Sequence, residues 1–219
     1  MTDPIMITET YLCRRFADLS DEDKRRVTNS YGDYNTTHDW WDCTCENFVA
    51  DMDTEHAIWV DMQKIYFSGF YSQGDGLTFE ATLDPAVFLI SQVNNLPDIH
   101  KEAGRIVLAA LRAEQIELEF TCKNYSQYAH GYAQGAELGI CWIDSELEDN
   151  KQTALTKAVD ELSLWLDEFC KEKAKELWRT LRDEYEYLTG EEAMAESFDA
   201  NDCVFEIGTG RMFHYHEGE

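Results

Sequence analysis

The spacing of apolar residues predicts helices over residues 1–62. Ser20, followed by three acidic residues, is typical of a helix N-terminus, and we expect that helix to end near Gly32. A second helix should be capped by Thr37 or Asp39. Beyond these caps, apolar residues recur at spacings of four, three and four, namely Trp41, Cys45, Phe48 and Met52. Such a stripe is typical of a helix face that packs against a core.

From Ile65 the apolar period changes to two, so we expect residues 63–145 to be rich in strands. Two alternating runs flank the turn Gln73–Gly76 and predict a hairpin. The clearest strand is 116–123, where apolar residues alternate with Glu, Thr and Lys. Residues 126–133 and 137–143 are two further strand candidates, each containing glycine.

Helices are expected on both sides of these strands. Asp84 and Pro85 should open one helix, and a second should run from about Pro97 to Arg112. Residues 151–189 predict a long amphipathic helix, which would extend about 55 Å at roughly 1.5 Å per residue. Residues 202–216 predict a terminal hairpin. The expected fold is therefore one α+β domain over 1–219, with a largely antiparallel sheet of hairpins, N-terminal helices and a long helix in the C-terminal half.

Charge narrows the classes of partner. The chain has 44 acidic and 18 basic residues, for a formal net charge of −26. The excess is steepest over residues 183–219, where 11 acidic residues face only Arg211. Such a field repels nucleic acid and anionic membranes and attracts basic proteins. We expect a basic protein partner, with no direct binding to nucleic acid or membrane.

The compartment follows from what the sequence lacks. It has no run of 18 apolar residues, and its N-terminus lacks the basic and then apolar pattern of a signal peptide. Seven cysteines are scattered along a chain long enough to build its own core. This favours reduced thiols in a cytoplasm over disulfides.

The stretch IYFSGFYSQGDGLTFEA, residues 65–81, has two readings. Gly69, Gly74 and Gly76 allow positive φ, which suits a tight hairpin that needs its glycines more than the carboxylate of Asp75. The alternative is a ligand loop. Its polar groups would be Ser72, Gln73 and Asp75, with His130 from the later aromatic stretch.

This stretch also resembles a segment of small bacteriophage-encoded proteins, in which Tyr-Phe-Ser-Gly-Phe precedes Ser-Gln-Gly-Asp-Gly; some of these proteins are labelled antitoxin-like. The resemblance covers about residues 40–143. It implies a phage origin, and hence the host cytoplasm as the compartment. It implies no catalytic residue.

The candidate metal and catalytic groups are poorly placed. Cys43 and Cys45 lie close to His38, but two residues apart on a helix they point about 200° away from each other. His214 and His216 are better read as edge residues of the terminal hairpin. With 44 acidic residues, chance carboxylate pairs are certain, so they identify no acid–base pair. We predict no catalytic residue, metal or cofactor.

The leading hypothesis is an acidic, non-enzymatic phage protein that inhibits a host defence or nucleic-acid-handling protein, with mimicry of DNA charge as one form. The candidate binding residues are Asp183, Glu184, Glu186, Tyr187, Glu191, Glu192 and Phe198, with Trp178 and Tyr185 as further aromatic anchors. The alternatives are acidity that serves only solubility, and a small-molecule binder or enzyme that uses the Ser72–Gly76 loop with His130.

Overall fold

The computed structural model describes residues 9–124, 134–144 and 147–215. The chain forms two compact units: a smaller unit of Met1–Trp40 with Asp183–Glu219, and a larger unit of Trp41–Arg182. Each unit combines helices with an antiparallel sheet, which confirms the predicted α+β class. That the whole chain is one domain stays a prediction.

The smaller unit is built from both ends of the chain. Its N-terminal elements are β1 (Cys13–Arg14), the 3-10 helices η1 (Phe16–Asp18) and η2 (Tyr34–Thr36), and α1 (Asp21–Tyr31). Its C-terminal elements are α6 (Glu191–Ala200), β6 (Cys203–Glu206) and β7 (Met212–His214). The three strands form one sheet in the order β1-β6-β7. The predicted terminal hairpin is confirmed as β6 and β7, and the two glycines of its turn, Gly208 and Gly210, have positive φ.

Aromatic rings dominate the core of the smaller unit. Phe198 lies 4.9 Å from Phe205 and 5.4 Å from Phe16, measured between ring centroids. The buried members of this core are Phe16, Leu19, Val27, Met194, Phe198, Cys203 and Phe205. Because they come from residues 16–27 and 194–205, this core requires the two ends of the chain to meet.

Asp23 connects helix α1 to the turn between β6 and β7. The Ser20 side chain caps α1 as predicted, accepting a hydrogen bond from the Asp23 N–H. The Asp23 carboxylate accepts hydrogen bonds from the Ser20 hydroxyl (2.8 Å), the Arg26 guanidinium (2.8 Å) and the Gly208 N–H (3.1 Å). These hydrogen bonds lower the pKa of Asp23, with the bond from Ser20 as the largest cause.

The larger unit holds the main sheet and most of the helices. Its helices are α2 (Asp42–His56), α3 (Pro85–Gln92), η3 (Asp98–His100), α4 (Lys101–Arg112) and the first part of α5 (Asp149–Leu188). Its strands are β2 (Trp59–Phe67), β3 (Leu77–Thr82), β4 (Ile116–Asn124) and β5 (Gln134–Trp142). All neighbouring strands are antiparallel, in the order β2-β3-β4-β5.

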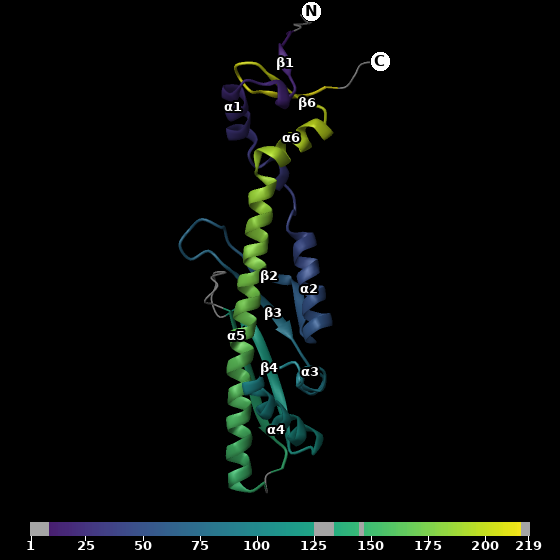
Figure 1. Ribbon diagram of the computed structural model, residues 1–219, viewed down its shortest axis with the longest axis vertical. Coiled ribbons are helices and arrows are strands. Elements are labelled where there is room, and N and C mark those ends of the chain that lie inside the picture. The colour runs from purple at the N-terminus through teal and green to yellow at the C-terminus, as the bar shows by residue number, and fades with distance from the viewer. Residues whose placement is uncertain (1–8, 125–133, 145–146, 216–219) are drawn as a thin grey trace, which may run out of the picture. The chain divides into compact units, whose positions relative to one another are not determined.

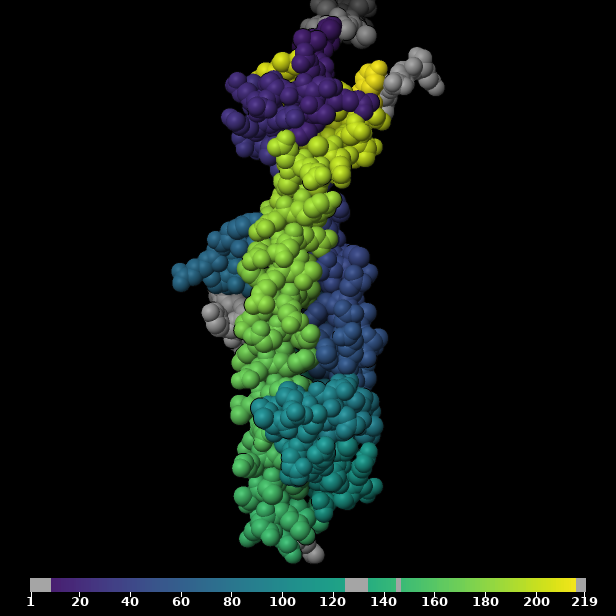
Figure 2. All heavy atoms as spheres, viewed as in Figure 1, coloured from purple at the N-terminus to yellow at the C-terminus, as the bar shows by residue number. Residues whose placement is uncertain are grey.

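Helix α5 runs along this sheet (Figure 1), and two of its side chains protect the edge formed by β5. Two N–H groups of β5, at Ala136 and Leu138, donate to the side chains of Asp167 and Ser163, at 3.0 Å each. An open strand edge is a template for aggregation, so these two polar side chains have a structural role. The buried stripe of α5 includes Leu155, Val159, Leu162, Leu166, Cys170, Leu177 and Leu181. Within the larger unit, the opposite side of the helix forms a continuous strip of surface (Figure 2).

Three details differ from the sequence predictions. Helix α2 begins after Trp41 with no side-chain cap, so neither Thr37 nor Asp39 caps it. The region predicted to be helical contains strand β1 and the start of β2 at Trp59. Helix α6 was not predicted, because it is short and follows the long helix after only two residues. Strand β5 confirms the strand predicted at 137–143 over residues 137–142. The other strand candidate, 126–133, lies outside the described residues and stays a prediction.

Candidate interaction surface

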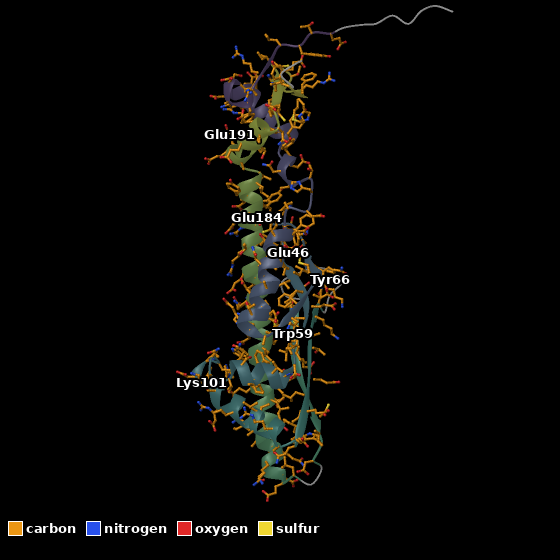
Figure 3. The ribbon with its side chains drawn as sticks, turned by 90° about the vertical axis from the view of Figure 1, so that its right-hand side faces the viewer. Glu46, Trp59, Tyr66, Lys101, Glu184 and Glu191 are labelled. Carbon is orange, nitrogen blue, oxygen red and sulfur yellow. The ribbon has the colours of Figure 1, made fainter. Side chains whose placement is uncertain are left out.

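The acidic residues near the end of α5 and in α6 form the candidate surface. Helix α6 begins after Gly190, and Glu191 and Glu192 occupy its first turn, where carboxylates stabilise the positive end of the helix dipole. Its apolar side, with Met194 and Phe198, faces the core. Glu191 and Glu192 are exposed, as are Asp183 and Glu186 on α5, whereas Glu184 is half-buried. Glu184 and Glu191 are labelled in Figure 3.

The aromatic residues predicted as anchors differ in their exposure. The side chain of Tyr187 is 60% exposed and is available to a partner. Phe198 is fully buried, because α6 turns it into the aromatic core, so we remove it from the candidate surface. Tyr185 is half-buried, with its ring centroid 5.7 Å from that of Trp40. Trp178 belongs to the larger unit, where its indole N–H donates to the Gly69 carbonyl at 3.3 Å.

Negative charge per residue is higher in the smaller unit than in the larger one. It contains 19 acidic and 6 basic residues, for a net charge of −13 over 77 residues. Asp199 pairs with Arg15 at 2.5 Å, and this exposed pair contributes little to stability. A shallow hollow of about 360 Å³ lies beside Glu191 and is lined on its other side by Lys24 and Arg25 of α1. The remaining surface of α6 is acidic.

The Ser72–Gly76 loop is held by hydrogen bonds within the hairpin. The Asp75 carboxylate accepts a hydrogen bond from the Ser72 N–H at 2.6 Å, and the Ser68 N–H donates to the Gly76 carbonyl at 3.0 Å. Of the three glycines in the loop, only Gly74 has a positive φ, of 96°. The loop spans residues 68–76, so it is longer than the expected tight turn, and Asp75 shapes it. Gln73 is exposed, and His130 lies outside the described residues.

The metal and thiol candidates do not converge in the part of the chain that the structure describes. No group of three or more His, Cys, Asp or Glu side chains there is placed to hold a metal ion. Cys43 is exposed and Cys45 is buried, as expected for opposite sides of α2. His214 lies near the Asn201 carbonyl, at 3.2 Å, and His216 is not among the described residues.

Two buried thiols, those of Cys170 and Cys203, have the properties of structural cysteines. All seven cysteines are free. Burial raises the pKa of Cys203 above that of an ordinary thiol, and a hydrogen bond with Cys122 is the largest cause of the raised pKa of Cys170. A raised pKa disfavours the thiolate, which is the nucleophilic form.

A polar hollow that the sequence did not predict lies between α2 and α5 in the larger unit. It has a volume of about 270 Å³ and is lined by residues that include Asp51, Glu55, His56, Lys173 and Glu176. The His56 ring lies edge-on to Phe169, with 4.9 Å between centroids. Burial, and secondly the charge of Lys173, lower the pKa of His56, so its imidazole is neutral at pH 7.

An apolar groove beside α3 was also missed. Val87 and Ile90 of α3 are exposed, whereas Phe88 and Leu89 of the same helix are buried. The sequence held a signal for it, because residues 85–90, PAVFLI, are all apolar, whereas a surface helix normally has a polar face.

Comparison with known proteins identifies a family without a known activity. None of the described helices is long and apolar enough to cross a membrane. No curated protein and no solved structure has significant similarity to the chain. Residues 40–191 match the family described as Domain of unknown function (DUF8835), a match that spans the larger unit and ends at the first residue of α6. The chain therefore belongs to the DUF8835 family.

Proposed function

We propose that this protein is an acidic, non-enzymatic interaction protein that binds a basic surface of another protein. The observation that carries the proposal is the charge of the smaller unit, 19 acidic against 6 basic residues in a unit of 77. The proposed contacts come from α5 and α6, namely Asp183, Glu184, Glu186, Glu191 and Glu192, with Tyr187 as the aromatic contact.

Electrostatics selects the class of partner. A net charge of −26 repels nucleic acids and anionic membranes and accelerates association with basic proteins. Charge alone supplies speed and orientation more than affinity, so an apolar contact is needed as well. Tyr187 is the exposed aromatic side chain beside these carboxylates, and tyrosine is enriched among residues that dominate binding energy.

The proposed target is a nucleic-acid-handling or defence protein of a bacterial host. Asp183, Glu184 and Glu186 place three carboxylates within about 6 Å of helix axis, at roughly 1.5 Å per residue. Duplex DNA presents one charge per roughly 1.7 Å, so the two linear densities are similar over this short length. The proposed phage origin rests on the resemblance of residues 65–81 to a segment of small bacteriophage-encoded proteins. For a protein of that origin we propose that binding inhibits the host target.

The small-molecule alternative has weaker support. The Asp75 carboxylate accepts the Ser72 N–H at 2.6 Å, which gives this acid a structural role within the loop. We therefore keep the loop as a structural element.

The test compares two variants with four neutralised acids each. One carries Glu184→Gln, Glu186→Gln, Glu191→Gln and Glu192→Gln. The matched control carries Glu46→Gln, Asp53→Asn, Glu119→Gln and Glu137→Gln, all exposed in the larger unit (Glu46 is labelled in Figure 3). The full-length proteins are immobilised and exposed to nuclease-treated bacterial lysate at 0.1 M salt. Retained proteins are identified and purified, and their binding kinetics are measured from 0.1 to 0.5 M salt with duplex DNA as competitor.

The expected result is a partner that duplex DNA displaces and whose association slows steeply as salt is added. The association slows because the Debye length falls from about 10 Å at 0.1 M salt towards about 3 Å at 1 M salt. The first variant should lower the association rate constant at least about tenfold, and the control variant far less. Tyr187→Ala should mainly speed dissociation. A partner that binds equally well at 0.1 and 0.5 M salt and is not displaced by duplex DNA would contradict the proposal. An association rate constant that falls as much with the control variant as with the first variant would also contradict it.

A further inference from the structure

The larger unit has an exposed apolar groove along α3, the end of α4 and strand β4. Two adjoining hollows of about 460 and 470 Å³ share the lining residues Ala86, Leu111 and Glu117. Ile90 is 56% exposed, Ile143 is 52% exposed and Trp59 is 44% exposed, and all three line the hollows (Trp59 is labelled in Figure 3). Large apolar side chains that gather around a hollow are typical of an interaction surface.

Local structure holds this groove open. The Asp84 carboxylate caps α3 through the N–H groups of Ala86 and Val87, at 2.9 and 3.0 Å. Gly104 lets α4 approach the end of α3, because a β-carbon there would lie 2.7 Å from a methyl group of Leu96. Phe88 and Leu89 fill the core, and this packing leaves Val87 and Ile90 directed outward. The exposure of the groove is thus set by packing on the opposite side of α3.

The rim of the groove is mainly acidic. Asp84, Glu114 and Glu117 line the two hollows, and Arg112 is the basic residue among the lining groups. A second copy of the chain would bring a further net charge of −26 to this surface, and an anionic membrane would also be repelled. Charge complementarity therefore favours an occupant that is both apolar and basic.

We propose that this groove docks a short basic segment of another protein, which inserts one or two aliphatic or aromatic side chains and places Lys or Arg against the rim. This docking proposal rests on the proposed function, from which it takes the basic character of the partner. It adds the main apolar anchor site, a role that Phe198 cannot fill because it is buried. The groove lies within residues 40–191, the part of the chain that matches the family.

The test uses three synthetic, fluorescently labelled 14-residue peptides with the full-length protein. The probe peptide carries leucines at positions i, i+3, i+4 and i+7 and lysines at six other positions. The second peptide replaces its leucines with serine, and the third replaces its lysines with glutamate. Binding is followed by fluorescence anisotropy at 0.1 M salt.

Two pairs of variants separate the groove from exposed apolar surface in general. The groove variant is Ile90→Ser with Ile143→Ser. Its control is Ile99→Ser with Leu164→Ser, which are 77% and 68% exposed and line neither hollow. The rim variant is Glu114→Gln with Glu117→Gln, and its control is Glu46→Gln with Glu137→Gln. Circular dichroism melting curves establish that each variant remains folded, which is expected because every changed side chain is exposed.

We expect the probe peptide to bind the wild type at least tenfold more tightly than the serine or glutamate peptides. The groove variant should lower the affinity for the probe peptide at least tenfold, and the rim variant at least fivefold. Both control variants should bind the probe peptide within twofold of the wild type. Equal binding of the leucine and serine peptides, or equal losses in the groove variant and its control, would overturn the proposal.

Other occupants give distinct results. Concentration-dependent self-association that Ile90→Ser abolishes, measured by sedimentation, would assign the groove to a second copy and overturn a basic partner. Binding of phosphatidylglycerol vesicles that depends on Ile90 would likewise overturn it. If the groove variant leaves peptide binding unchanged while the four-acid variant of α5 and α6 still slows partner association, the docking proposal fails and the proposed function stands.

Discussion

The smaller unit has 77 residues and the larger unit has 142, yet each has a net charge of −13. The smaller unit thus has nearly twice the charge per residue. It turns its phenylalanines into a compact aromatic core and exposes carboxylates on α6. The larger unit has enough surface to expose an apolar groove as well. The two proposals assign different roles to the units: the smaller unit would supply long-range attraction of a basic partner, and the larger unit would supply short-range apolar contact.

Removing the central ring of the smaller unit should have the largest effect. Phe198 is fully buried and contacts the rings of Phe16, Tyr34 and Phe205. Phe198→Ala should cost about 3–5 kcal/mol, because it removes buried apolar area and leaves a cavity. Limited proteolysis with mass spectrometry should then show cleavage in residues 9–40 and 183–215 before cleavage in the larger unit. Tyr187→Ala, at an exposed position, is the control. If Phe198→Ala and the wild type are equally resistant to proteolysis in the smaller unit, the predicted role of its aromatic core is wrong.

A loop substitution should destabilise the larger unit by a smaller amount. Gly74 has a φ of 96°, a conformation that β-branched residues rarely adopt. Gly74→Val should therefore cost about 1–2 kcal/mol, read as a lower urea midpoint in denaturation followed by circular dichroism. Gln73→Val, at the preceding exposed position, should leave the midpoint nearly unchanged. Equal midpoints for the two variants would show that the loop does not need the positive φ.

Acid should weaken the smaller unit through Asp23. Its pKa is lowered in the folded state by the Ser20 hydroxyl, the Gly208 N–H and Arg26, so its ionised form stabilises the fold. This stabilisation is present above the ordinary aspartate pKa of about 3.9 and is lost as the pH falls through the lower pKa of the folded state. Asp23→Asn should therefore be less stable than wild type at pH 7, and the gap should close towards pH 2. A gap in unfolding free energy that is constant with pH would contradict this role.

The larger unit should show a weaker pH dependence nearer neutrality. The lowered pKa of His56 means that folding favours the neutral imidazole, so its contribution is complete above the unfolded pKa of about 6.5. It declines as the pH falls from there towards the pKa of the folded state. His56→Gln should reduce the loss of stability between pH 7 and pH 5, whereas His38→Gln, in the smaller unit, should not. If the unfolding free energy of the His56 variant depends on pH between pH 7 and pH 5 as that of the wild type does, the prediction that His56 causes this pH dependence is wrong.

The sequence predicted most elements, because their signals are local. Ser20 caps α1, and Asp84 with Pro85 opens α3, as the residue types required. The long helix is predicted at 151–189 and observed at 149–188, since a stripe of that length has no competing period. The start of α2 was predicted wrongly, because Thr37 and Asp39 are good capping residues but lie between η2 and α2 and do not cap the helix. The candidate acids on α5 and α6 were selected from the sequence and stay a prediction, and the sequence did not predict the apolar groove.

By itself the sequence determined the charge, the α+β class and the order of the main helices and strands, because these depend on residue type and on periods of 3.6 and 2. Only the tertiary structure decided that β1 pairs with β6, that Phe198 is buried and that Asp167 and Ser163 protect the edge of β5. It also decided that Ile90 and Ile143 remain exposed. The physical reason is that an apolar residue is buried only where another element covers it, and that cover comes from residues distant in the chain.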